Sequence, residues 1–419
     1  MNSVLVIGSG GREHTICWAL AKSKKIDKIY CLPGNGGISE IAECVDIGVM
    51  DFDKIVDFVD NHKDITLTVV APDDPLAAGL VDRLEERGHR AFGPRANAAI
   101  IEGSKAFSKY LMKKYGIPTA DYEEFNDYEK AVEYLKNAKY PLVVKADGLA
   151  LGKGVIICNT KEEGLQAAKD MMIDAKFKDA GKTVIVEEFM VGQEVSILSF
   201  CDGKTIVPMV NARDHKRAYD NDQGLNTGGM GTFSPSAIYT DEVADEVLHK
   251  IILPTVDAMN KEGRTFKGVL YFGLMLTDEG AKVVEYNARF GDPETQVVLP
   301  RLKTDLYDIF NAVVDGTLDK INIEWNDLAC VCVVMASGGY PESYKKGMEI
   351  TIGDIDKDVI VFHAGTKLKD GKLYTNGGRV LGVTAMGKDI HEAREKAYKN
   401  VKKISFDGAF YRTDIGIKK

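Results

Sequence analysis

The sequence predicts a multidomain protein that combines α/β and α+β lobes. Its 419 residues are enough for about two to four domains. Over the first 100 residues, short β-rich runs alternate with amphipathic segments, which is typical of a parallel sheet with helices on both faces. After residue 326 the pattern changes to several short strands with one helix near residues 389–402, which predicts a final α+β lobe.

The composition excludes several classes of protein. Hydrophobic residues form 45% of the chain and charged residues 28%, which argues against disorder and against a coiled coil. A net charge of -9 disfavours nucleic acid and anionic membranes as partners. The first apolar run, at residues 4–7, is too short for a membrane span and follows no basic segment, so we expect a cytoplasmic protein. The seven cysteines have no zinc-binding spacing, and we expect Cys330 and Cys332 to be core residues in a reducing compartment.

The N-terminal lobe is expected to carry strands at residues 4–7, 28–32, 67–71 and 91–92. Loops rich in glycine, proline or aspartate follow the first three of them. Ligands of such sheets bind outside the carboxyl ends of the strands. These loops are therefore the expected place for a small anionic ligand.

The segment GSGGREH, residues 8–14, follows the first strand and opens a helix. The backbone N–H groups of Gly10 and Gly11, together with Arg12, could hold a phosphate at the positive end of the helix dipole. A dinucleotide fingerprint would need glycine in place of Glu13 and an acid after the second strand, and both are missing. A monophosphate is favoured over a nicotinamide cofactor, and a tight turn with a solvated Arg12 is the structural alternative.

A helix is expected from residue 103 to Tyr115, capped by Ser104 and ended by Gly116. The next elements, at residues 141–189, look like a small α+β insertion. Its turn, KADGLALGKGV at residues 145–155, places two lysines around three glycines and can close over a polyphosphate. A glycine hairpin with a solvated lysine would show the same pattern.

Two further polar segments, each at a predicted turn or loop, are candidates for ligand binding. Residues 187–190 end a strand, and Glu194 begins the next, so backbone groups and a carboxylate could receive an adenine edge and ribose hydroxyls. Two acids at a solvated strand end are the alternative. Residues 214–231 are expected to form a long functional loop or, alternatively, a mobile surface loop.

The strongest group of residues lies in VEYNARFGDPE, residues 284–294. Glu285, Asn287 and Arg289 alternate on a predicted strand, so they share one face. The oxygen atoms of Glu285 and Asn287 suit Mg²⁺, and Arg289 beside them could stabilise charge on a transferring phosphoryl group. A purely structural polar face is the alternative, although it would be costly to bury.

These motifs together resemble the phosphoribosylamine–glycine ligase (glycinamide ribonucleotide synthetase) family of the ATP-grasp superfamily. The likeness covers essentially the whole chain and includes DHKR at 214–217, NTGGMG at 226–231, SGGYP at 337–341, FHAGT at 362–366, GGRVLGVTA at 377–385 and YRTDIG at 411–416. It implies an N-terminal α/β lobe (1–103), an ATP-grasp central lobe (104–120 and 191–326), an inserted lid (121–190) and a C-terminal α+β lobe (327–419).

The resemblance also implies the site residues. The ATP-binding residues would be Lys105, Lys145, Gly152, Lys153, Gly154, Glu187, Glu188, Phe189, Met190 and Glu194. The metal ligands would be Glu285 and Asn287, for Mg²⁺ or Mn²⁺. The substrate-binding residues would be Gly10, Gly11, Arg12, Glu13, Asp73, Asp214, Asn226, Arg289, Gly291 and Asp292, with Arg289, Lys145 and Asp214 catalytic. Leu151, Asp73 and Leu225 depart from the usual family pattern, and no acid at 271–276 offers a further metal ligand, so the number of metal ions stays open.

The implied reaction is the ATP-dependent ligation of glycine to 5-phosphoribosylamine through glycyl phosphate, giving glycinamide ribonucleotide, ADP and phosphate in purine biosynthesis. Glycine, 5-phosphoribosylamine and ATP would be the small-molecule partners, with transient contact to the upstream amidotransferase. Three alternatives stay open: another ATP-grasp carboxylate–amine ligase or carboxylase, a nicotinamide-dependent oxidoreductase, and a catalytically silent nucleotide-binding protein.

Overall fold

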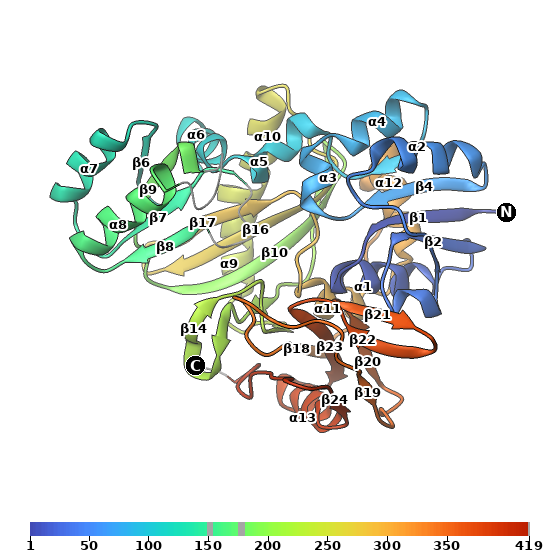
Figure 1. The fold of residues 1–419 in the computed structure, drawn as a ribbon. Coiled ribbons are helices and arrows are strands. Elements are labelled where there is room, and N and C mark those ends of the chain that lie inside the picture. The colour runs from blue at the N-terminus through green and yellow to red at the C-terminus, as the bar shows by residue number, and fades with distance from the viewer. Residues whose placement is uncertain (149–153, 175–180, 418–419) are drawn as a thin grey trace.

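A computed structural model describes residues 1–148, 154–174 and 181–417 of the chain. Figure 1 shows the arrangement of its elements: the N-terminal sheet lies at one end, a small lid at the other, and the central sheet between them. The C-terminal sheet lies below the central and N-terminal elements in this view.

The N-terminal lobe is a parallel sheet, as predicted, with the strand order β3-β2-β1-β4-β5. Its strands are β1 (Ser3–Gly8), β2 (Lys28–Pro33), β3 (Glu43–Cys44), β4 (Ile65–Val70) and β5 (Ala91–Phe92). Its helices are α1 (Gly11–Leu20), η1 (Ile38–Glu40), α2 (Phe52–Asn61), α3 (Asp73–Ala77), α4 (Leu80–Glu86) and α5 (Ala96–Gly103). Alternate residues of β1 belong to two different hydrophobic clusters: Leu5 packs in the cluster that includes α2 and α4, and Val4 in the one that includes α1. Both faces of the sheet are therefore covered.

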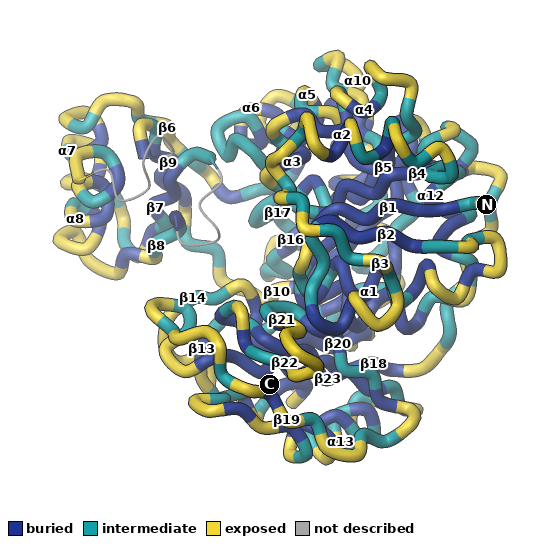
Figure 2. Tube along the Cα trace, turned by 45° about the vertical axis from the view of Figure 1, so that its right-hand side comes forward, coloured by how far each residue is buried: buried dark blue, intermediate teal, exposed yellow. Residues whose placement is uncertain are grey.

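The lid is an antiparallel sheet with its own core. Its strands are β6 (Tyr122–Phe125), β7 (Leu142–Ala146), β8 (Val155–Cys158) and β9 (Val184–Glu188), in the order β6-β9-β7-β8. Helices α7 (Tyr128–Asn137) and α8 (Lys161–Met172) complete a hydrophobic cluster that contains lid residues alone. Figure 2 shows this buried centre set apart from the rest of the molecule.

The central sheet is antiparallel, with the order β11-β10-β16-β17. Its strands are β10 (Gln193–Cys201), β11 (Ile206–Pro208), β16 (Gly268–Thr277) and β17 (Gly280–Asn287). Helices α6 (Lys105–Tyr115), α9 (Asp241–Val247) and α10 (Leu253–Lys261) pack with it, and a π-helical turn, η4 (Leu248–Ile252), joins the last two. The predicted end signals of α6 are confirmed: Ser104 accepts the Phe107 N–H, and Gly116 adopts a φ of 68°.

The C-terminal sheet has the order β12-β15-β18-β23-β20. Its strands are β12 (Arg213–Asp214), β15 (Gly231–Ser234), β18 (Ala329–Ala336), β20 (Val359–His363) and β23 (Arg379–Gly387), with α13 (Ile390–Val401) packed on them. Two small pairs are β19 (Thr351–Ile352) with β24 (Ile404–Ser405), and β21 (Thr366–Lys369) with β22 (Lys372–Thr375). The connecting helices are α11 (Thr295–Val298), η5 (Leu299–Arg301), α12 (Leu306–Asp315) and η6 (Leu318–Lys320). Strands β12 and β15 come from the segment expected in the central lobe, so the chain enters the C-terminal sheet, returns to the central sheet at β16 and enters the C-terminal sheet again at β18.

The expectation of one long loop at residues 214–231 is wrong. Besides β12 and the start of β15, this segment forms a hairpin of β13 (Arg217–Tyr219) and β14 (Gln223–Asn226), joined by η3 (Asp220–Asp222). The C-terminal segment holds the hairpin, because the buried Arg412 donates to Asp222 Oδ1 at 3.0 Å and the Thr413 N–H donates to Asp220 Oδ1 at 2.7 Å. These partners are far apart in sequence, so local patterns do not reveal the hairpin.

Two other expectations concern the cysteines and membranes. All seven cysteines are free, and Cys330 and Cys332 are fully buried, as expected of core residues. Within the described ranges, no helix combines the length and the apolar character needed to cross a membrane.

Two buried histidines join the N-terminal and C-terminal lobes. The His363 N–H donates to His14 Nδ1 at 2.7 Å, and Asn35 Nδ2 donates to the carbonyls of Ser9 and His363, each at 2.9 Å. Burial, reinforced by His363, lowers the pKa of His14 to about 3, and burial lowers the pKa of His363 to about 4. Both side chains are therefore neutral in the folded protein at neutral pH.

This contact predicts a loss of stability in mild acid. Below a pH of about 6.5, the unfolded chain binds protons on both histidines that the folded chain excludes until a much lower pH. The contribution of the two neutral histidines to the free energy of unfolding should therefore be fully present above this pH. Below this pH, the free energy of unfolding should fall by about 1.4 kcal/mol per pH unit for each histidine. His14→Gln keeps an acceptor but removes one titrating group, so urea unfolding between pH 7 and 5 should show a shallower slope. The exposed control His391→Gln should keep the wild-type slope, and an unchanged slope in His14→Gln would contradict the assignment.

Candidate active site

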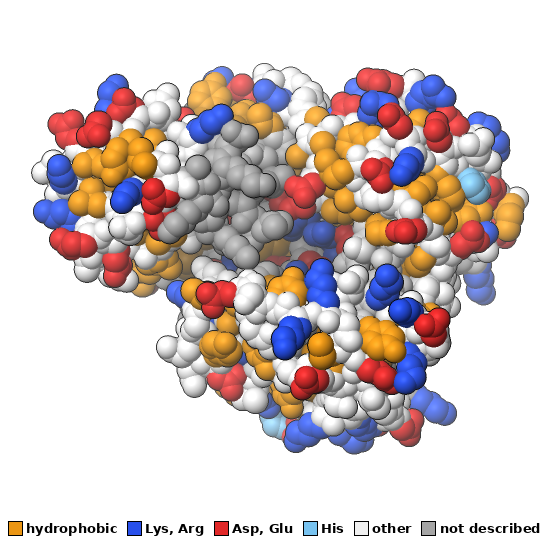
Figure 3. All heavy atoms as spheres, viewed as in Figure 1, with side chains coloured by type: hydrophobic (Ala, Val, Ile, Leu, Met, Phe, Trp, Pro, Cys, Tyr) orange, Lys and Arg blue, Asp and Glu red, His pale blue; other side chains and the backbone are white. Residues whose placement is uncertain are grey.

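A cavity of about 950 Å³ lies where the lid, the central sheet and the two outer lobes meet. In Figure 3, acidic and basic side chains gather at this junction. Of the predicted site residues, the cavity is lined by Arg12, Asp73, Lys105, Lys145, Gly154, Glu187, Glu188, Phe189, Met190, Glu194, Asp214, Asn226, Glu285, Asn287, Arg289 and Asp292. Gly10, Gly11, Glu13 and Gly291 are not among the lining residues, and Gly152 and Lys153 lie outside the described residues.

A cluster of lysines lines the cavity beneath the lid. Lys145 on β7 and Lys109 on α6 both contact Glu187 Oε2 on β9, at 2.9 and 3.3 Å, and all three side chains are buried. Burial lowers the pKa of Lys109 to about 8, against the attraction of Glu187. Lys105, whose pKa is also lowered by burial, donates to the Gly148 carbonyl at 2.8 Å. Two ammonium groups on one carboxylate, with Lys105 lining the same cavity, form a wall suited to a polyanion.

Only part of the predicted adenine-binding segment is available to contact a ligand. The Glu187 carboxylate is committed to lysines, whereas Phe189 and Met190 are half-buried and offer apolar surface to the cavity. The Glu188 N–H donates to the Asp121 carbonyl at 2.9 Å, and the Glu188 side chain is exposed.

Glu285 and Asn287 lie on the same face of β17, as predicted. Lys216 Nζ lies 3.6 Å from Glu285 Oε1 and 3.4 Å from Glu194 Oε2. Burial would raise the pKa of Glu285, but Lys216 and then Lys145 outweigh it, so the pKa is lowered and Glu285 is ionised at neutral pH.

These two residues fit a divalent cation that is also bound by phosphate. The Asn287 amide is best oriented with its nitrogen donating to Glu102 Oε1 at 2.9 Å, which leaves the amide oxygen available as a ligand. One carboxylate and one amide oxygen match Mg²⁺, which binds one or two protein groups and completes its shell with water and substrate phosphates. Among the described residues, no group of three or more His, Cys, Asp or Glu side chains could hold a metal alone. The cation would therefore bind together with the nucleotide.

Arg289 lies in a bend two residues beyond the end of β17, not on the strand as predicted, and forms a largely buried ion pair, with Nη2 2.9 Å from Glu102 Oε1. Its Nε group is buried and has no hydrogen-bond partner in the described part of the chain. A guanidinium held by one carboxylate with an unused donor is suited to contact a phosphoryl oxygen.

In the N-terminal loop, two backbone amides that were expected to be free for a phosphate already have hydrogen-bond partners within the protein. The Gly10 N–H donates to Glu13 Oε2 at 2.7 Å, and the Arg12 N–H donates to Asp292 Oδ2 at 3.2 Å. Glu13 thus occupies one of the amides, that of Gly10, that a phosphate was expected to contact, and Asp292 occupies that of Arg12. The Arg12 guanidinium donates to Glu13 Oε1 and to the Phe290 carbonyl, at 2.7 and 3.0 Å, and lines the cavity.

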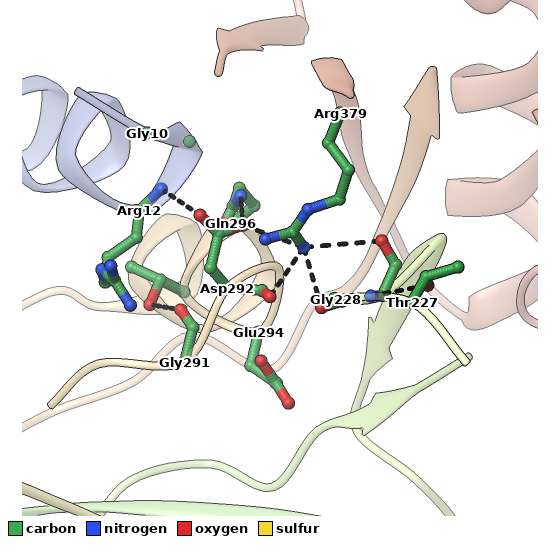
Figure 4. A network of polar contacts seen from close by, with 12 residues as sticks. Gly10, Arg12, Thr227, Gly228, Gly291, Asp292, Glu294, Gln296 and Arg379 are labelled. Atoms are coloured by element: carbon green, nitrogen blue, oxygen red, sulfur yellow. Dashed lines mark hydrogen bonds and ion pairs between the residues drawn. The ribbon is translucent and has the colours of Figure 1, made fainter. Parts of the chain in front are cut away.

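Figure 4 shows how Asp292 connects Arg12 with Arg379 of the C-terminal lobe. Arg379 Nη1 donates to the carbonyls of Gly228 and Asp292, each at 2.8 Å, and lies 3.5 Å from Asp292 Oδ1. Gln296 Nε2 donates to the same carboxylate oxygen at 2.8 Å. Although burial opposes it, the two arginines lower the pKa of Asp292, so this carboxylate is ionised.

Asp214, Asn226 and Asp73 line other parts of the cavity, at the end of β12, the end of β14 and the start of α3. Burial, and then the charge of Glu294, raises the pKa of Asp214 well above its ordinary value. Glu294 is 4% exposed, and its Oε1 accepts hydrogen bonds from Tyr271 OH at 3.0 Å and from Ser196 Oγ at 3.2 Å.

Sequence reasoning missed several residues of the cavity wall. They are Glu102, Lys109, Lys216, Tyr271, Glu294 and Arg379. Lys216, Glu294 and Arg379 lie inside sequence motifs named above, but their residue types alone did not indicate a role in the site. Glu102 and Lys109 stand on ordinary helices, where only tertiary packing shows that they face the cavity.

The chain matches three family models in order along its length. They describe phosphoribosylglycinamide synthetase: its N domain matches residues 2–102, its ATP-grasp (A) domain residues 103–295 and its C domain residues 330–418.

Relatives match over nearly the whole chain. The phosphoribosylamine–glycine ligase of Halalkalibacterium halodurans is 49% identical over 417 residues, which cover 99% of this chain and 97% of the relative. That of Caldanaerobacter subterraneus is also 49% identical, over 98% of this chain and 99% of the relative. The crystal structure of the phosphoribosylamine–glycine ligase from Thermotoga maritima is similar, with a TM-score of 0.86 and 36% identity over 98% of this chain and 99% of that one. The chain, with its ATP-grasp domain and its charged cavity, therefore belongs to the phosphoribosylamine–glycine ligase family.

Proposed function

We propose that this protein ligates glycine to 5-phosphoribosylamine at the expense of ATP, forming glycinamide ribonucleotide, ADP and phosphate. The observation that carries the proposal is one cavity in which Lys105 and Lys145 face Glu285, Asn287 and Arg289. The relatives named for this reaction match the chain over nearly its full length, which supports the same activity here.

The chemistry explains why such a cavity suffices. A carboxylate does not react with an amine until one of its oxygens becomes a good leaving group. A glycine carboxylate oxygen attacks the γ-phosphorus of ATP, the bond to the β-phosphate oxygen breaks, and ADP leaves. The amine of phosphoribosylamine then attacks the acyl carbon of glycyl phosphate, and phosphate leaves with the electrons of the C–O bond. The protein supplies position and charge, and no side chain has to act as a nucleophile.

The residues at the lid and central sheet would bind ATP. Lys105 and Lys145 would hold phosphate oxygens, and Gly152, Lys153 and Gly154 are proposed as further ATP-binding residues, of which the first two lie outside the described residues. Phe189 and Met190 would contact adenine, and Glu194 the ribose. Glu285 and Asn287 would hold Mg²⁺ or Mn²⁺, which neutralises phosphate charge when bound. Arg289 would stabilise charge on the γ-phosphoryl group.

The residues at the outer lobes would bind the ribosyl phosphate. Arg12 faces the cavity from the N-terminal lobe, and Asp73, Asn226 and Asp292 offer polar atoms nearby. Gly10, Gly11, Glu13 and Gly291 would act through backbone geometry, since they do not line the cavity. The domain boundaries given above, a cytoplasmic location and transient contact with an amidotransferase belong to the same proposal.

One assay tests the function. ADP release is measured with Mg·ATP and glycine, with and without freshly formed phosphoribosylamine. Release that depends on both substrates supports the ligase. Another carboxylic acid in place of glycine would indicate a different ligase or a carboxylase, and no turnover would indicate a binding protein. The oxidoreductase is disfavoured, because Glu13 occupies the loop that a pyrophosphate would need.

Glu285→Gln should fold normally and lose most activity. The substitution keeps the shape of the side chain but removes the charge on the proposed metal ligand. The loss should be about 3 kcal/mol in the barrier, roughly 100-fold in kcat at saturating Mg²⁺. Glu279→Gln, on the exposed turn before the same strand, is the control and should keep wild-type turnover. Wild-type kcat in Glu285→Gln would exclude this residue from the mechanism.

Arg12→Ala should weaken phosphoribosylamine binding while leaving ATP binding unchanged. Loss of one charge-assisted contact should raise the KM for phosphoribosylamine by a factor that corresponds to about 1.5–3 kcal/mol. Product titration measures the same loss without turnover, and the exposed Arg83→Ala serves as control. A lowered unfolding temperature with unchanged product affinity would show instead that Arg12 only holds Glu13.

A further inference from the structure

One buried carboxylate contacts three consecutive residues at the end of β17. Glu102 lies near the end of α5, and its side chain is 8% exposed. Its Oε1 lies 2.9 Å from Arg289 Nη2 and accepts the Asn287 amide at the same distance, and its Oε2 accepts the Ala288 N–H at 2.7 Å. The proposed reaction uses Asn287 and Arg289, and it leaves the carboxylate that holds both of them without a role.

Burial makes these contacts necessary for Glu102. Desolvation raises the pKa of its carboxyl group, and the charge of Arg289 and the Ala288 N–H oppose this shift. An ionised carboxylate can only accept hydrogen bonds, and all three groups that contact it here are donors. The carboxylate is therefore satisfied only while each of these groups turns a donor toward it.

The Asn287 amide has two possible orientations, and Glu102 decides between them. With its nitrogen toward Glu102, the amide donates to Oε1 and, at 3.3 Å, to the Tyr286 carbonyl. With its oxygen toward Glu102, it would accept from Arg289 Nη2 at 3.3 Å but would place two acceptors 2.9 Å apart. Such an approach of an amide oxygen to a carboxylate is unfavourable, so the first orientation is preferred. That orientation leaves the amide oxygen available as a metal ligand.

The same carboxylate fixes the Arg289 guanidinium. Its Nη2 pairs with Glu102, and its Nη1 donates to the Phe290 carbonyl at 3.3 Å. The guanidinium is planar, so these two contacts determine its plane. The buried Nε, which has no partner in the described part of the chain, remains as the donor that a ligand can use.

We propose that Glu102 is a positioning residue, which orients the Asn287 amide for the metal ion and the Arg289 guanidinium for the phosphoryl group. The inference rests on the proposed function, because that function assigns the tasks of these two side chains. Groups that hold metal ligands in place commonly change metal affinity or activity by about 10- to 100-fold. Because α5 belongs to the N-terminal lobe, the contact also makes this lobe part of the proposed ATP site.

Glu102→Gln tests the orientation of the amide. The substitution keeps the shape of the side chain but replaces one acceptor with an NH₂ donor, which lets the Asn287 oxygen turn toward it. Calorimetry with ADP, with and without Mg²⁺, gives the factor by which Mg²⁺ raises ADP affinity. This factor should fall by about 10-fold or more, while ADP affinity without metal stays unchanged. The control Glu86→Gln, at the exposed end of α4, should keep the wild-type factor.

Two further substitutions separate position from charge and from folding. Glu102→Asp keeps the charge but withdraws it from the amide by one methylene group, so it should lose most of the Mg²⁺ factor as well. Asn287→Asp presents two equivalent oxygens, so orientation no longer matters, and it should restore the factor in the Glu102→Gln background. An undiminished factor in Glu102→Gln or in Glu102→Asp, or no recovery in the double variant, would overturn the inference. Thermal unfolding checks that the variants fold, and Glu102→Asp decides if Glu102→Gln is unstable.

The Mg²⁺ factor is measured without turnover, so it separates this inference from the proposed function. Loss of the factor in Glu102→Gln and its recovery in the double variant support the positioning role even if the wild type does not ligate glycine. Ligation by the wild type together with an unchanged factor in Glu102→Gln would overturn the positioning role and leave the function intact. A wild-type ADP affinity that does not respond to Mg²⁺ would overturn the inference together with the proposed metal site.

Discussion

The Asp292 carboxylate is the contact on which the arrangement of the lobes around the cavity depends. It receives the Arg12 N–H from the N-terminal lobe, Gln296 from α11 and the Arg379 guanidinium from the C-terminal lobe. A buried carboxylate is stable only when donors and cations surround it, so the three segments must come together for any of them to be satisfied. The outer lobes are thereby fixed against the segment that follows β17, the strand that carries Glu285 and Asn287.

The charges of the cavity are sorted in space rather than mixed. Lysines line the cavity beneath the lid, where a polyphosphate would enter, and Lys216 contacts Glu194 and Glu285 of the central sheet. This arrangement suits the binding of a nucleotide polyanion, because the lysines offer positive charge to its phosphates. Burial strengthens this attraction, since the effective dielectric constant inside the cavity is lower than that of water.

The sequence predicted those parts of the fold that depend on local patterns. The parallel N-terminal sheet followed from apolar runs separated by turns, and α6 from its cap and its terminal glycine. The shared face of Glu285 and Asn287 followed from strand alternation, whereas Arg289 lines the same cavity from a bend beyond the end of β17. The hairpin at residues 217–226 could not be predicted, because Arg412 and Thr413, about 190 residues later, hold it in place. Arg379 and Lys109 were missed for the same reason: their roles arise from neighbours distant in the chain.

The glycine-rich loop at residues 8–14 was correctly predicted to precede a helix N-terminus, but the group that binds its amides is a carboxylate of the protein, Glu13, and not a phosphate. Glycines at a strand end before a helix do mark a helix N-terminus with unpaired amides. In this chain, a carboxylate three residues after Gly10 folds back to satisfy one of these amides, and Asp292 satisfies another.

The anion-binding capacity of the loop is therefore used within the protein to join α1 to the central strand segment. Among Gly10, Gly11, Arg12 and Glu13, Arg12 is the residue that lines the cavity. Specificity for the ribosyl phosphate must then come from side chains contributed by several lobes. That requirement explains why the cavity forms only where all the lobes meet.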